Sequence, residues 1–562
     1  MEKRFIARAP LSTTSHRRCA SLLRVRIAGQ DPLPASKQKE SDISLRSRRR
    51  KCVISTGSSS CTFCVSRGVA CTNGTLALSP KSGNSPRGHG PVVSTPTTPG
   101  EQSPDKYAQL PPMPLRLELI ELYFDFIHDQ FHHLFHRPTF LDDAVQQRVP
   151  PIIIYAISAL SARFSKNQAF AGIKVWERST GFAKEAAQLL DVCDLSLATI
   201  QACVLLGTLN RTEGQGALET IHYSVACRMA QLLDLPNRPA ENAIERELNL
   251  RVWWTLSKVD VWSSAGVGLP RQMPPIDDFP LPVDEDTFRS WGRDIPVSVT
   301  DSNTDRKSSL FAQMLILTRI LVRILDFHKA IVSGNTPPSD FSAKTTELSK
   351  SLDSWHNTLP TQLQDTAENM EAHGAKGLGR IFVALHIGYY HCGQLLFYQF
   401  LQEDCHGSLQ DAQAYASKCR FYATSLCDLL DRSSRAPDCS VLYTMVGHDL
   451  VIASTVQVHT LLFSSSDSEI SSANRRLTRN FEILSNLKEY WPVLETSFMR
   501  LRTFQEACTG KGMETSFAMN RWMVRFLYEF ARPVGERKEL DSKGRPWTDS
   551  QLWSVENIGI NQ

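Results

Sequence analysis

The chain has 562 residues and a formal net charge of +4, but its charge is unevenly distributed. Residues 1–104 contain 17 Lys or Arg against 5 Asp or Glu, whereas the remaining residues contain 45 against 53. A basic head on a mildly acidic body fits an anionic partner at the N-terminal end and excludes a protein coated with nucleic acid along its length. The 14 cysteines are few for this length and lie mostly in apolar stretches, which favours a reduced, intracellular protein over a disulfide scaffold.

The first 110 residues divide into three stretches of different composition. Residues 1–41 have no persistent periodicity, and we expect them to be either disordered or wrongly joined to the rest of the sequence. Residues 42–75 hold closely spaced cysteines directly after a basic run. Residues 76–110 are rich in Ser, Thr, Pro and Gly with few large apolar side chains, so burial cannot offset their ordering entropy. This composition predicts a disordered linker.

Four cysteines with the spacing C-x8-C-x2-C-x6-C carry most of the functional information: Cys52, Cys61, Cys64 and Cys71. Thiolates this close together, beside a run of arginines and a lysine, indicate zinc next to a nucleic-acid-binding surface. The basic run alone is also typical of a nuclear import signal or a solvated charge cluster. Import and DNA binding can share these residues, so the two interpretations do not exclude each other.

The remaining chain, residues 111–532, has apolar residues at three- and four-residue steps, which predicts a mainly α fold with one large all-helical domain. We expect helices at 115–135, 151–164, 197–212, 217–235, 245–270, 308–333, 343–358, 378–403, 409–432, 440–464, 473–508 and 515–532. Polar insertions are predicted near 284–307 and 465–472, and residues 533–562 read as a flexible tail. The apolar stretch from Ile381 carries histidines and tyrosines, so it predicts a buried helix rather than a membrane span.

The cysteine stretch resembles the DNA-binding module of the fungal binuclear zinc-cluster transcription factors. Their pattern is C-x2-C-R-x-R-K-x-K-C, a loop, and C-x2-C-x6-C, with six cysteines around two zinc ions. The positions of this chain that fall on the pattern are Arg46, Arg48, Arg49 (where the family has Lys), Lys51, Cys52, Cys61, Cys64 and Cys71.

The resemblance implies a role for each of these residues. Arg48 and Arg49 would face the guanine edges of a CGG triplet in the major groove, where Arg can bond O6 and N7 together. Arg46 and Lys51 would contact phosphates and position the module. The four cysteines would bind Zn²⁺, which replaces the hydrophobic core that so short a segment lacks.

The chain departs from the family pattern at two specific positions. The first two cysteines are expected at positions 42 and 45, which hold Asp42 and Leu45. Because the first family cysteine bridges both metals, this sequence completes at most one four-thiolate site. Two explanations stay open. Either the N-terminal sequence is wrongly joined, or the module has decayed in a protein that regulates without reading DNA itself.

Residues 115–290 resemble the helical regulatory domain that follows the linker in many of these factors. One signature stretch contains Phe135, His136, Pro138 and Phe140. The positions of the last signature stretch are Glu247, Arg251, Trp253, Trp254, Asp260, Ser264, Gly268 and Pro270. Glu247 and Arg251 have the favourable order for a helical ion pair, and the two tryptophans read as core. The family usually has arginines where this chain has Val261 and Leu269.

Other chemistry finds little support in the sequence. His128 and His132 are four residues apart, as helix-borne zinc ligands are, and His133 and His136 lie nearby. The regulatory-domain signature explains these histidines without metal. No phosphate loop, dinucleotide fingerprint or nucleophile elbow occurs, so we expect no enzyme.

These observations predict a nuclear transcription regulator that binds double-stranded DNA at CGG-type sites through a zinc cluster. The helical domain would control its activity by sensing a metabolite or a partner. Expected partners are CGG-containing DNA, a second copy of the chain as one option, and the transcription machinery or co-regulators, with no membrane. The alternative is a helical regulatory or interaction protein that has lost direct DNA binding.

Overall fold

The computed structural model describes residues 110–531, except residues 131, 276–278, 302–305, 336–337, 403–408, 510–516 and 518. All of these residues belong to one compact unit. The described part of the chain is built from helices without a β-strand, which confirms the mainly α fold. The residues predicted to bind zinc and DNA lie outside the described ranges, as do most of the predicted linker and the tail from residue 533.

The α-helices, in chain order, are α3 (Met113–Phe126), α4 (Arg137–Val145), α5 (Pro151–Ser161), α6 (Thr180–Leu189), α7 (Leu197–Thr212), α8 (Gly216–Leu232), α9 (Ala243–Val267), α10 (Glu285–Ser290), α11 (Leu310–Val332), α12 (Pro338–Thr358), α13 (Ala367–Ala375), α14 (Gly379–Phe397), α15 (Leu409–Ser433), α16 (Met445–Phe463), α17 (Asp467–Tyr490), α18 (Glu495–Thr509) and α19 (Arg521–Tyr528). Short 3-10 helices are η1 (Ala162–Phe164), η2 (Gln168–Phe170), η3 (Val175–Ser179), η4 (Leu235–Asn237), η5 (Val297–Asp301), η6 (Arg306–Ser308), η7 (Thr361–Leu363), η8 (Tyr398–Leu401) and η9 (Pro492–Leu494).

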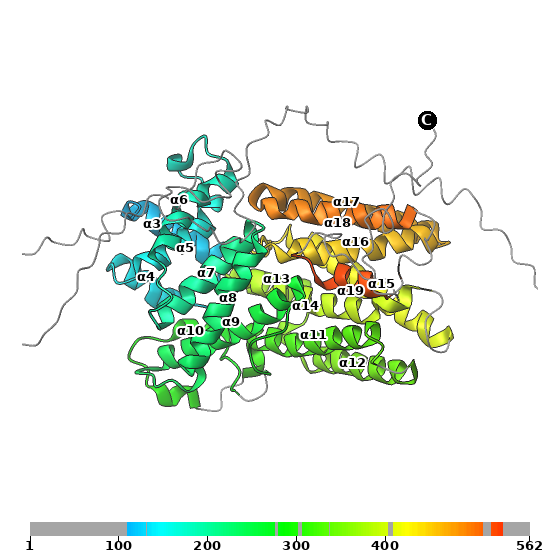
Figure 1. Ribbon diagram of the computed structural model, residues 1–562, viewed down its shortest axis with the longest axis horizontal. Helices are drawn as coiled ribbons and strands as arrows, with labels where there is room; N and C mark the ends of the chain where they lie inside the picture. Colours follow the sequence, from blue (N-terminus) through cyan, green and yellow to red (C-terminus); the bar gives the residue numbers. More distant parts are fainter. Residues whose placement is uncertain are drawn as a thin grey trace, which may run out of the picture. The chain divides into compact units, whose positions relative to one another are not determined.

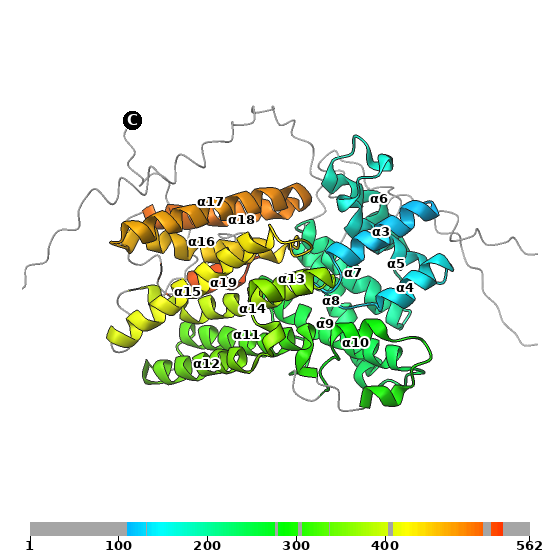
Figure 2. The same ribbon diagram turned by 180° about the vertical axis from the view of Figure 1, so that it is seen from behind.

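Within this unit the early helices α3–α8 gather at one end, and α11, α12 and α14–α18 are layered at the other (Figures 1 and 2). Sequential helices pack as neighbours: α7 on α8, α8 on α9, α14 on α15, and α16 on α17. The two ends are tied together where α11 packs against both α9 and α14. One core of buried apolar side chains therefore extends from Leu110 to Tyr528.

Capping residues explain where the central helices begin and end. Ser196 accepts a hydrogen bond from the Thr199 amide at the start of α7, and Asn242 accepts one from Glu245 at the start of α9. Helix α9 ends at Val267 and is capped by Gly268, whose φ of 65° is left-handed and suits glycine, and Pro270 follows. Almost every face of α9 is buried, so this helix lies at the centre of the packing.

The predicted helix at 115–135 is wrong in its second half. Helix α3 ends at Phe126, and Asp129 has a left-handed φ of 65°, so the chain continues irregularly until α4. The apolar pattern continued because Leu134 and Phe135 are buried without being helical. The two histidines at 128 and 132 are therefore not one turn apart on a helix.

Other element predictions also need correction. The predicted helix at 473–508 is two helices, α17 and α18, separated by η9, which begins at Pro492. The predicted insertion at 465–472 includes the start of α17. The insertion at 284–307 contains α10, and its Phe288 and Trp291 form a small separate core with Val283. Helices α4, α6 and α13 were not predicted.

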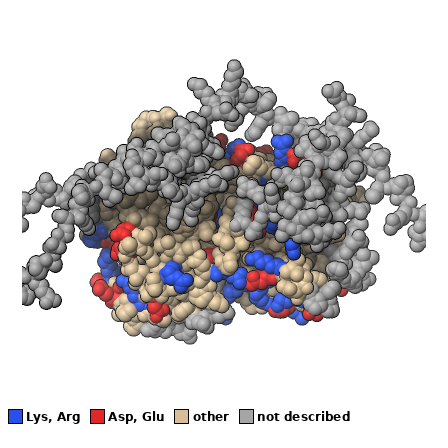
Figure 3. Space-filling model, viewed as in Figure 1, with Lys and Arg blue, Asp and Glu red and all other residues tan. Residues whose placement is uncertain are grey.

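In the described part of the chain, no helix has both the length and the apolar character needed to cross a membrane. The stretch from Ile381 lies in α14, whose side chains are nearly all buried in the protein core. On the face shown in Figure 3, blue and red side chains are interspersed where the surface is not covered by grey atoms. Many charged side chains of the described residues form ion pairs at the surface, such as Arg271 with Asp326 at 3.0 Å.

Candidate functional site

The signature residues Glu247 and Arg251 form a buried ion pair that also holds the chain at Val283. Arg251 Nε donates to Glu247 Oε1 at 2.9 Å, and the two side chains are 3% and 1% exposed. The Val283 amide donates to Glu247 Oε1 at 3.0 Å, and its carbonyl accepts from Arg251 Nη2 at 2.6 Å. The Arg251 guanidinium also lies 4.3 Å from the centroid of the Phe288 ring. The pair thus fixes the segment after α9 against the helix.

The remaining signature residues also serve the packing of α9. Trp254 is fully buried, and its Nε1 donates to the Pro280 carbonyl at 2.9 Å, while Trp253 is buried against Phe279. Asp260 accepts hydrogen bonds from Ser264 Oγ at 3.0 Å and from two backbone amides. Those amides belong to Gln272, at 2.7 Å, and Met273, at 2.8 Å, in the segment that follows Pro270. The signature therefore shapes the turn after α9.

Each of the four histidines after α3 has a protein group against at least one ring nitrogen, while His133 Nε2 is buried without a hydrogen bond. His128 Nδ1 lies 2.8 Å from Asp129 Oδ1, and its Nε2 accepts from two backbone amides, each at 3.2 Å. His132 Nε2 bonds Tyr123 at 2.8 Å, His133 Nδ1 bonds Asp129 at 3.0 Å, and His136 Nε2 bonds a backbone carbonyl at 2.9 Å. Burial works to raise the pKa of Asp129, but the two histidines beside it hold that pKa well below its usual range. These contacts brace an irregular segment and leave this group without the arrangement of a metal centre.

A cavity of about 70 Å³ lies at the centre of the helical unit and is the best candidate for a functional site. Its wall comes from α9, α11, α14, the start of α16 and the segment after α3. This volume holds roughly five water molecules. Apolar side chains such as Leu317, Leu321 and Ile387 cover most of the wall. We call it the central cavity.

Two polar side chains of this wall make no hydrogen bond or ion pair with a described residue. Lys258, on α9, is 6% exposed, and its Nζ lies 5.5 Å from the centroid of the Phe311 ring. Burial lowers the pKa of Lys258 to about 7, against the opposing attraction of the Asp129 carboxylate. Gln130 is 3% exposed, and both its amide oxygen and its amide nitrogen are buried without a hydrogen bond. Buried polar groups of this kind are costly, and so each needs an explanation.

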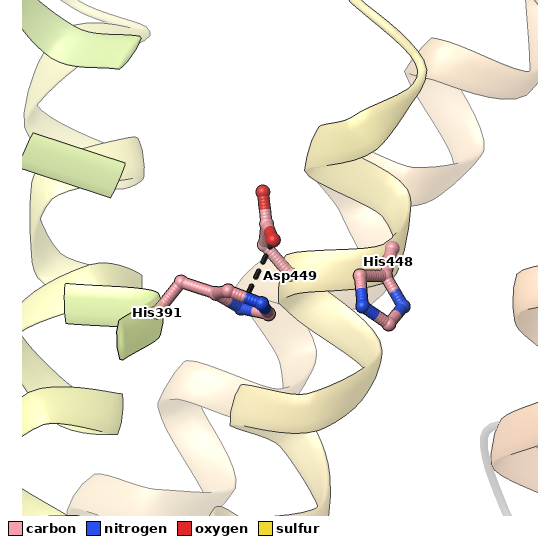
Figure 4. Close-up of side chains that lie close together, drawn as sticks. All are labelled: His391, His448 and Asp449. Atoms are coloured by element: carbon pink, nitrogen blue, oxygen red, sulfur yellow. Dashed lines mark ion pairs between the residues drawn. The ribbon is translucent and has the colours of Figure 1, made fainter. Parts of the chain in front are cut away.

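A third polar group lies on the α14–α16 side of the cavity. His391 projects from α14 toward α16, which carries both His448 and Asp449 (Figure 4). His391 Nδ1 and Asp449 Oδ1 are 3.1 Å apart, but the contact lacks hydrogen-bond alignment. Burial raises the pKa of Asp449 well above its usual range and lowers the pKa of His391 to about 3. Both shifts disfavour the charged forms, so burial works against a salt bridge at this contact.

His391, His448 and Asp449 place three ligand atoms within 4.8 Å of one another, the spacing of a metal site. The chemistry around His448 opposes a cation. Arg500 Nη1 donates to His448 Nδ1 at 2.9 Å, and an arginine can only donate. Burial lowers the pKa of Arg500 to about 9, which leaves it protonated at neutral pH. A metal ion here would face that buried guanidinium, so this trio does not suit one.

Comparison with known proteins places this helical unit in context. Residues 120–357 match the family described as the fungal specific transcription factor domain. The match covers α4 to α12 and ends inside the unit, so the central cavity straddles its boundary. Lys258 lies within the matched region, whereas His391 and Asp449 lie beyond it.

Curated relatives carry corresponding names. A protein of Schizosaccharomyces pombe named as an uncharacterized transcriptional regulatory protein is 29% identical over 52% of this chain and 33% of its own length. A Zn(2)-C6 fungal-type transcription factor of Fusarium oxysporum f. sp. lycopersici, FTF1c, is 24% identical over 70% of this chain and 46% of its own length. A second S. pombe protein named as a transcriptional regulatory protein is 21% identical over 84% of this chain and 80% of its own length.

The chain spans about a third to a half of the length of the first two relatives. Their names support transcription regulation as the class of function and point to a regulator rather than an enzyme. Sequence reasoning identified the regulatory-domain signature but missed the central cavity. Lys258, Gln130 and Asp449 are far apart in the sequence, and only the packing of four helices brings them to one wall.

Proposed function

We propose that this protein regulates transcription in the nucleus by binding double-stranded DNA through its cysteine module, under the control of the helical unit. The observation that carries the proposal is the match of residues 120–357 to a transcription factor domain behind a module of four cysteines and four basic residues in register. The names of the relatives support the same class of function. CGG-type sites are the expected target because Arg48 and Arg49 fall on the guanine-reading positions of the resemblance.

The donor set of the module fits one zinc ion. Cys52, Cys61, Cys64 and Cys71 supply four thiolates, the number that a structural zinc site needs. A second zinc does not fit, because Asp42 and Leu45 stand where two further cysteines would be required. Zinc bound here would supply folding energy to the module, and Arg46 and Lys51 would hold it on the phosphates.

The helical unit is the proposed control element. Its cavity is lined both by the region that matches the transcription factor domain and by helices beyond that region. A ligand that contacts both the matched region and the helices beyond it would favour one arrangement of these two parts over another. It shifts the equilibrium between the two arrangements by the difference in its affinity for them. A second copy of the chain and co-regulators are further proposed partners.

The test measures zinc and DNA binding on the full chain. Zinc content by mass spectrometry should be one ion per chain, and Cys61→Ser should abolish it. Fluorescence anisotropy on a CGG-containing duplex should show binding that weakens steeply with salt, and a duplex with the CGG triplets scrambled serves as the matched control. Affinity that hardly changes between low and moderate salt would contradict DNA binding.

A second candidate function rests on Asp42 and Leu45. A chain with neither zinc nor salt-dependent DNA binding would be a helical regulatory or interaction protein that acts through partners. Sequencing the 5′ end of the transcript sets the zinc content to expect: a message that encodes Cys-x2-Cys before Arg46 restores the complete two-zinc module. A message that encodes Asp42 and Leu45 leaves at most one zinc ion, and the zinc and DNA-binding measurements then decide between the two functions.

A further inference from the structure

The central cavity presents unpaired groups of opposite kinds on one continuous wall. Lys258 and Gln130 lie on the α9 side, and Asp449 lies on the α16 side with His391. Within the described residues, both polar atoms of the Gln130 amide are buried without a hydrogen bond, and Asp449 Oδ1 has only the misaligned contact with His391. Lys258 Nζ has a cation–π contact with Phe311 at 5.5 Å but no ion pair with a described residue, and apolar side chains make up much of the remaining wall.

These groups are not needed to hold the fold. A buried lysine and a buried aspartate that form no direct salt bridge cost stability, although the Asp129 carboxylate offsets part of the cost of Lys258. Apolar residues of similar size would pack there more favourably. Salt bridges to nearby protein groups neutralise several of the unit's other buried charges, as Arg251 does for Glu247 at 2.9 Å and Arg211 does for Glu219 at 3.2 Å. Lys258 and Asp449 are also buried, yet they line the cavity without such a partner.

We propose that the central cavity binds a small zwitterion that carries both a carboxylate and an ammonium group. Lys258 and Gln130 receive the carboxylate: the amine donates to it as an ammonium, and the Gln130 amide nitrogen donates a second hydrogen bond. Asp449 receives the ligand's ammonium. The short aliphatic chain between these groups packs on Leu317, Leu321 and Ile387.

The size and charge of the cavity favour a small zwitterion over larger ligands and over ligands with a single charge. Room for about five waters corresponds to an amino-acid-sized molecule rather than a nucleotide or a sterol. A simple carboxylate would satisfy Lys258 but leave Asp449 unpaired, and a simple amine would do the reverse. Because a counter-ion offsets the cost of burying a charge, the zwitterion would stabilise the charged forms of Lys258 and Asp449 together.

This inference deepens the proposed function by naming the chemistry of the controlling ligand. Ligand binding itself does not depend on the proposed function, but the effect of the ligand on transcription rests on it. Binding is measured by isothermal titration calorimetry on the full chain, with two isomeric five-carbon zwitterions, norvaline and 5-aminopentanoate, as probes. Pentanoate and pentylamine each carry one of the two charges and serve as comparators. The better zwitterion should bind with a Kd below about 1 mM and at least about tenfold tighter than either comparator.

Two variants assign the ends of the ligand. Lys258→Met should cost at least about tenfold in affinity for the zwitterion while leaving pentylamine unaffected, and Asp449→Asn should do the same while leaving pentanoate unaffected. Lys350→Met and Asp294→Asn change exposed residues of the same types and should bind as the wild type does. Neither cavity variant should lower the melting temperature, which separates lost binding from lost folding.

The outcomes that overturn the proposal are specific. Pentanoate or pentylamine binding as tightly as the zwitterion would remove the two-ended recognition. Binding of neither zwitterion, or equal loss in the two control variants, would remove the site. These results do not depend on the zinc and DNA measurements, so a chain that binds the zwitterion without binding DNA would sustain this inference while refuting the DNA-binding function.

Discussion

Arg251→Met tests whether the buried ion pair of Glu247 and Arg251 stabilises the helical unit. The substitution leaves the Glu247 carboxylate 1% exposed, with the Val283 amide as its remaining close donor and Arg306 Nη1 at 3.9 Å. Removing one partner of a buried pair costs about 3–5 kcal/mol, and the nearby Arg306 places the expectation at the lower end, about 3 kcal/mol. For a helical unit of this size, that loss lowers the melting temperature by roughly 3 °C.

The assay combines thermal unfolding with hydrogen exchange on the full chain. Exchange of the Val283 amide should accelerate in Arg251→Met, because both of its links to α9 depend on the pair. Glu247→Gln in the same chain keeps an acceptor for Val283 and removes the buried charge, so the double variant should regain about half of the loss. Arg502→Met, which breaks an exposed pair with Glu506, is the matched control and should change stability by under about 1 kcal/mol. A loss in Arg251→Met no larger than this control would refute the reasoning.

Three further predictions concern the cavity, the core and the module. The pKa of Lys258 is about 7 in the folded chain and about 10.5 in the unfolded chain. Between these pH values the unfolded chain binds one more proton than the folded chain, so the free energy of unfolding rises with pH. Urea unfolding at pH 7, 8 and 9 should show this slope, up to about 1.4 kcal/mol per pH unit, reduced in Lys258→Met, and parallel profiles would contradict it. Gly393→Ala would place a Cβ against the Tyr422 ring where α14 meets α15 and should cost about 1–3 kcal/mol in chemical denaturation, whereas an unchanged midpoint would refute that close approach. Arg49→Ala should weaken binding to CGG-containing DNA by about 1–3 kcal/mol and relax base preference, and equal weakening on scrambled DNA would make it a phosphate contact.

Periodicity predicted the helices best where local signals agreed with the packing. Helix α7 begins and ends where its pattern does, because Ser196 caps it and its apolar face is buried throughout. The pattern failed after Phe126, since Leu134 and Phe135 are buried in irregular chain and mimic helical spacing. Pro492 was a usable signal for the break between α17 and α18, because proline disfavours a helical residue before it.

The candidate site could be predicted only in part. The spacing of Glu247 and Arg251 was enough to foresee their ion pair, because both residues lie on one helix. Trp254 was correctly expected in the core from its type and surroundings. The central cavity could not be foreseen, since a lone lysine in α9 reads as a surface residue until α11 and α14 are known to cover it. The set of side chains that line the cavity depends on tertiary packing rather than on any local motif.

The continuous core has a consequence for how this chain can be divided. The boundary of the matched region at residue 357 falls at the end of α12, yet α11 packs against α14 across it. A fragment ending at 357 would bare the sides of α9 and α11 that α14 and α16 cover, including Leu317 and Leu321. Such a fragment would expose a large apolar surface, and we expect it to aggregate unless chaperones bind it. We therefore expect the whole helical unit, rather than the matched region alone, to be the piece that can be expressed as a folded protein. Substitutions on one side of residue 357 must also be compatible with the packing on the other side.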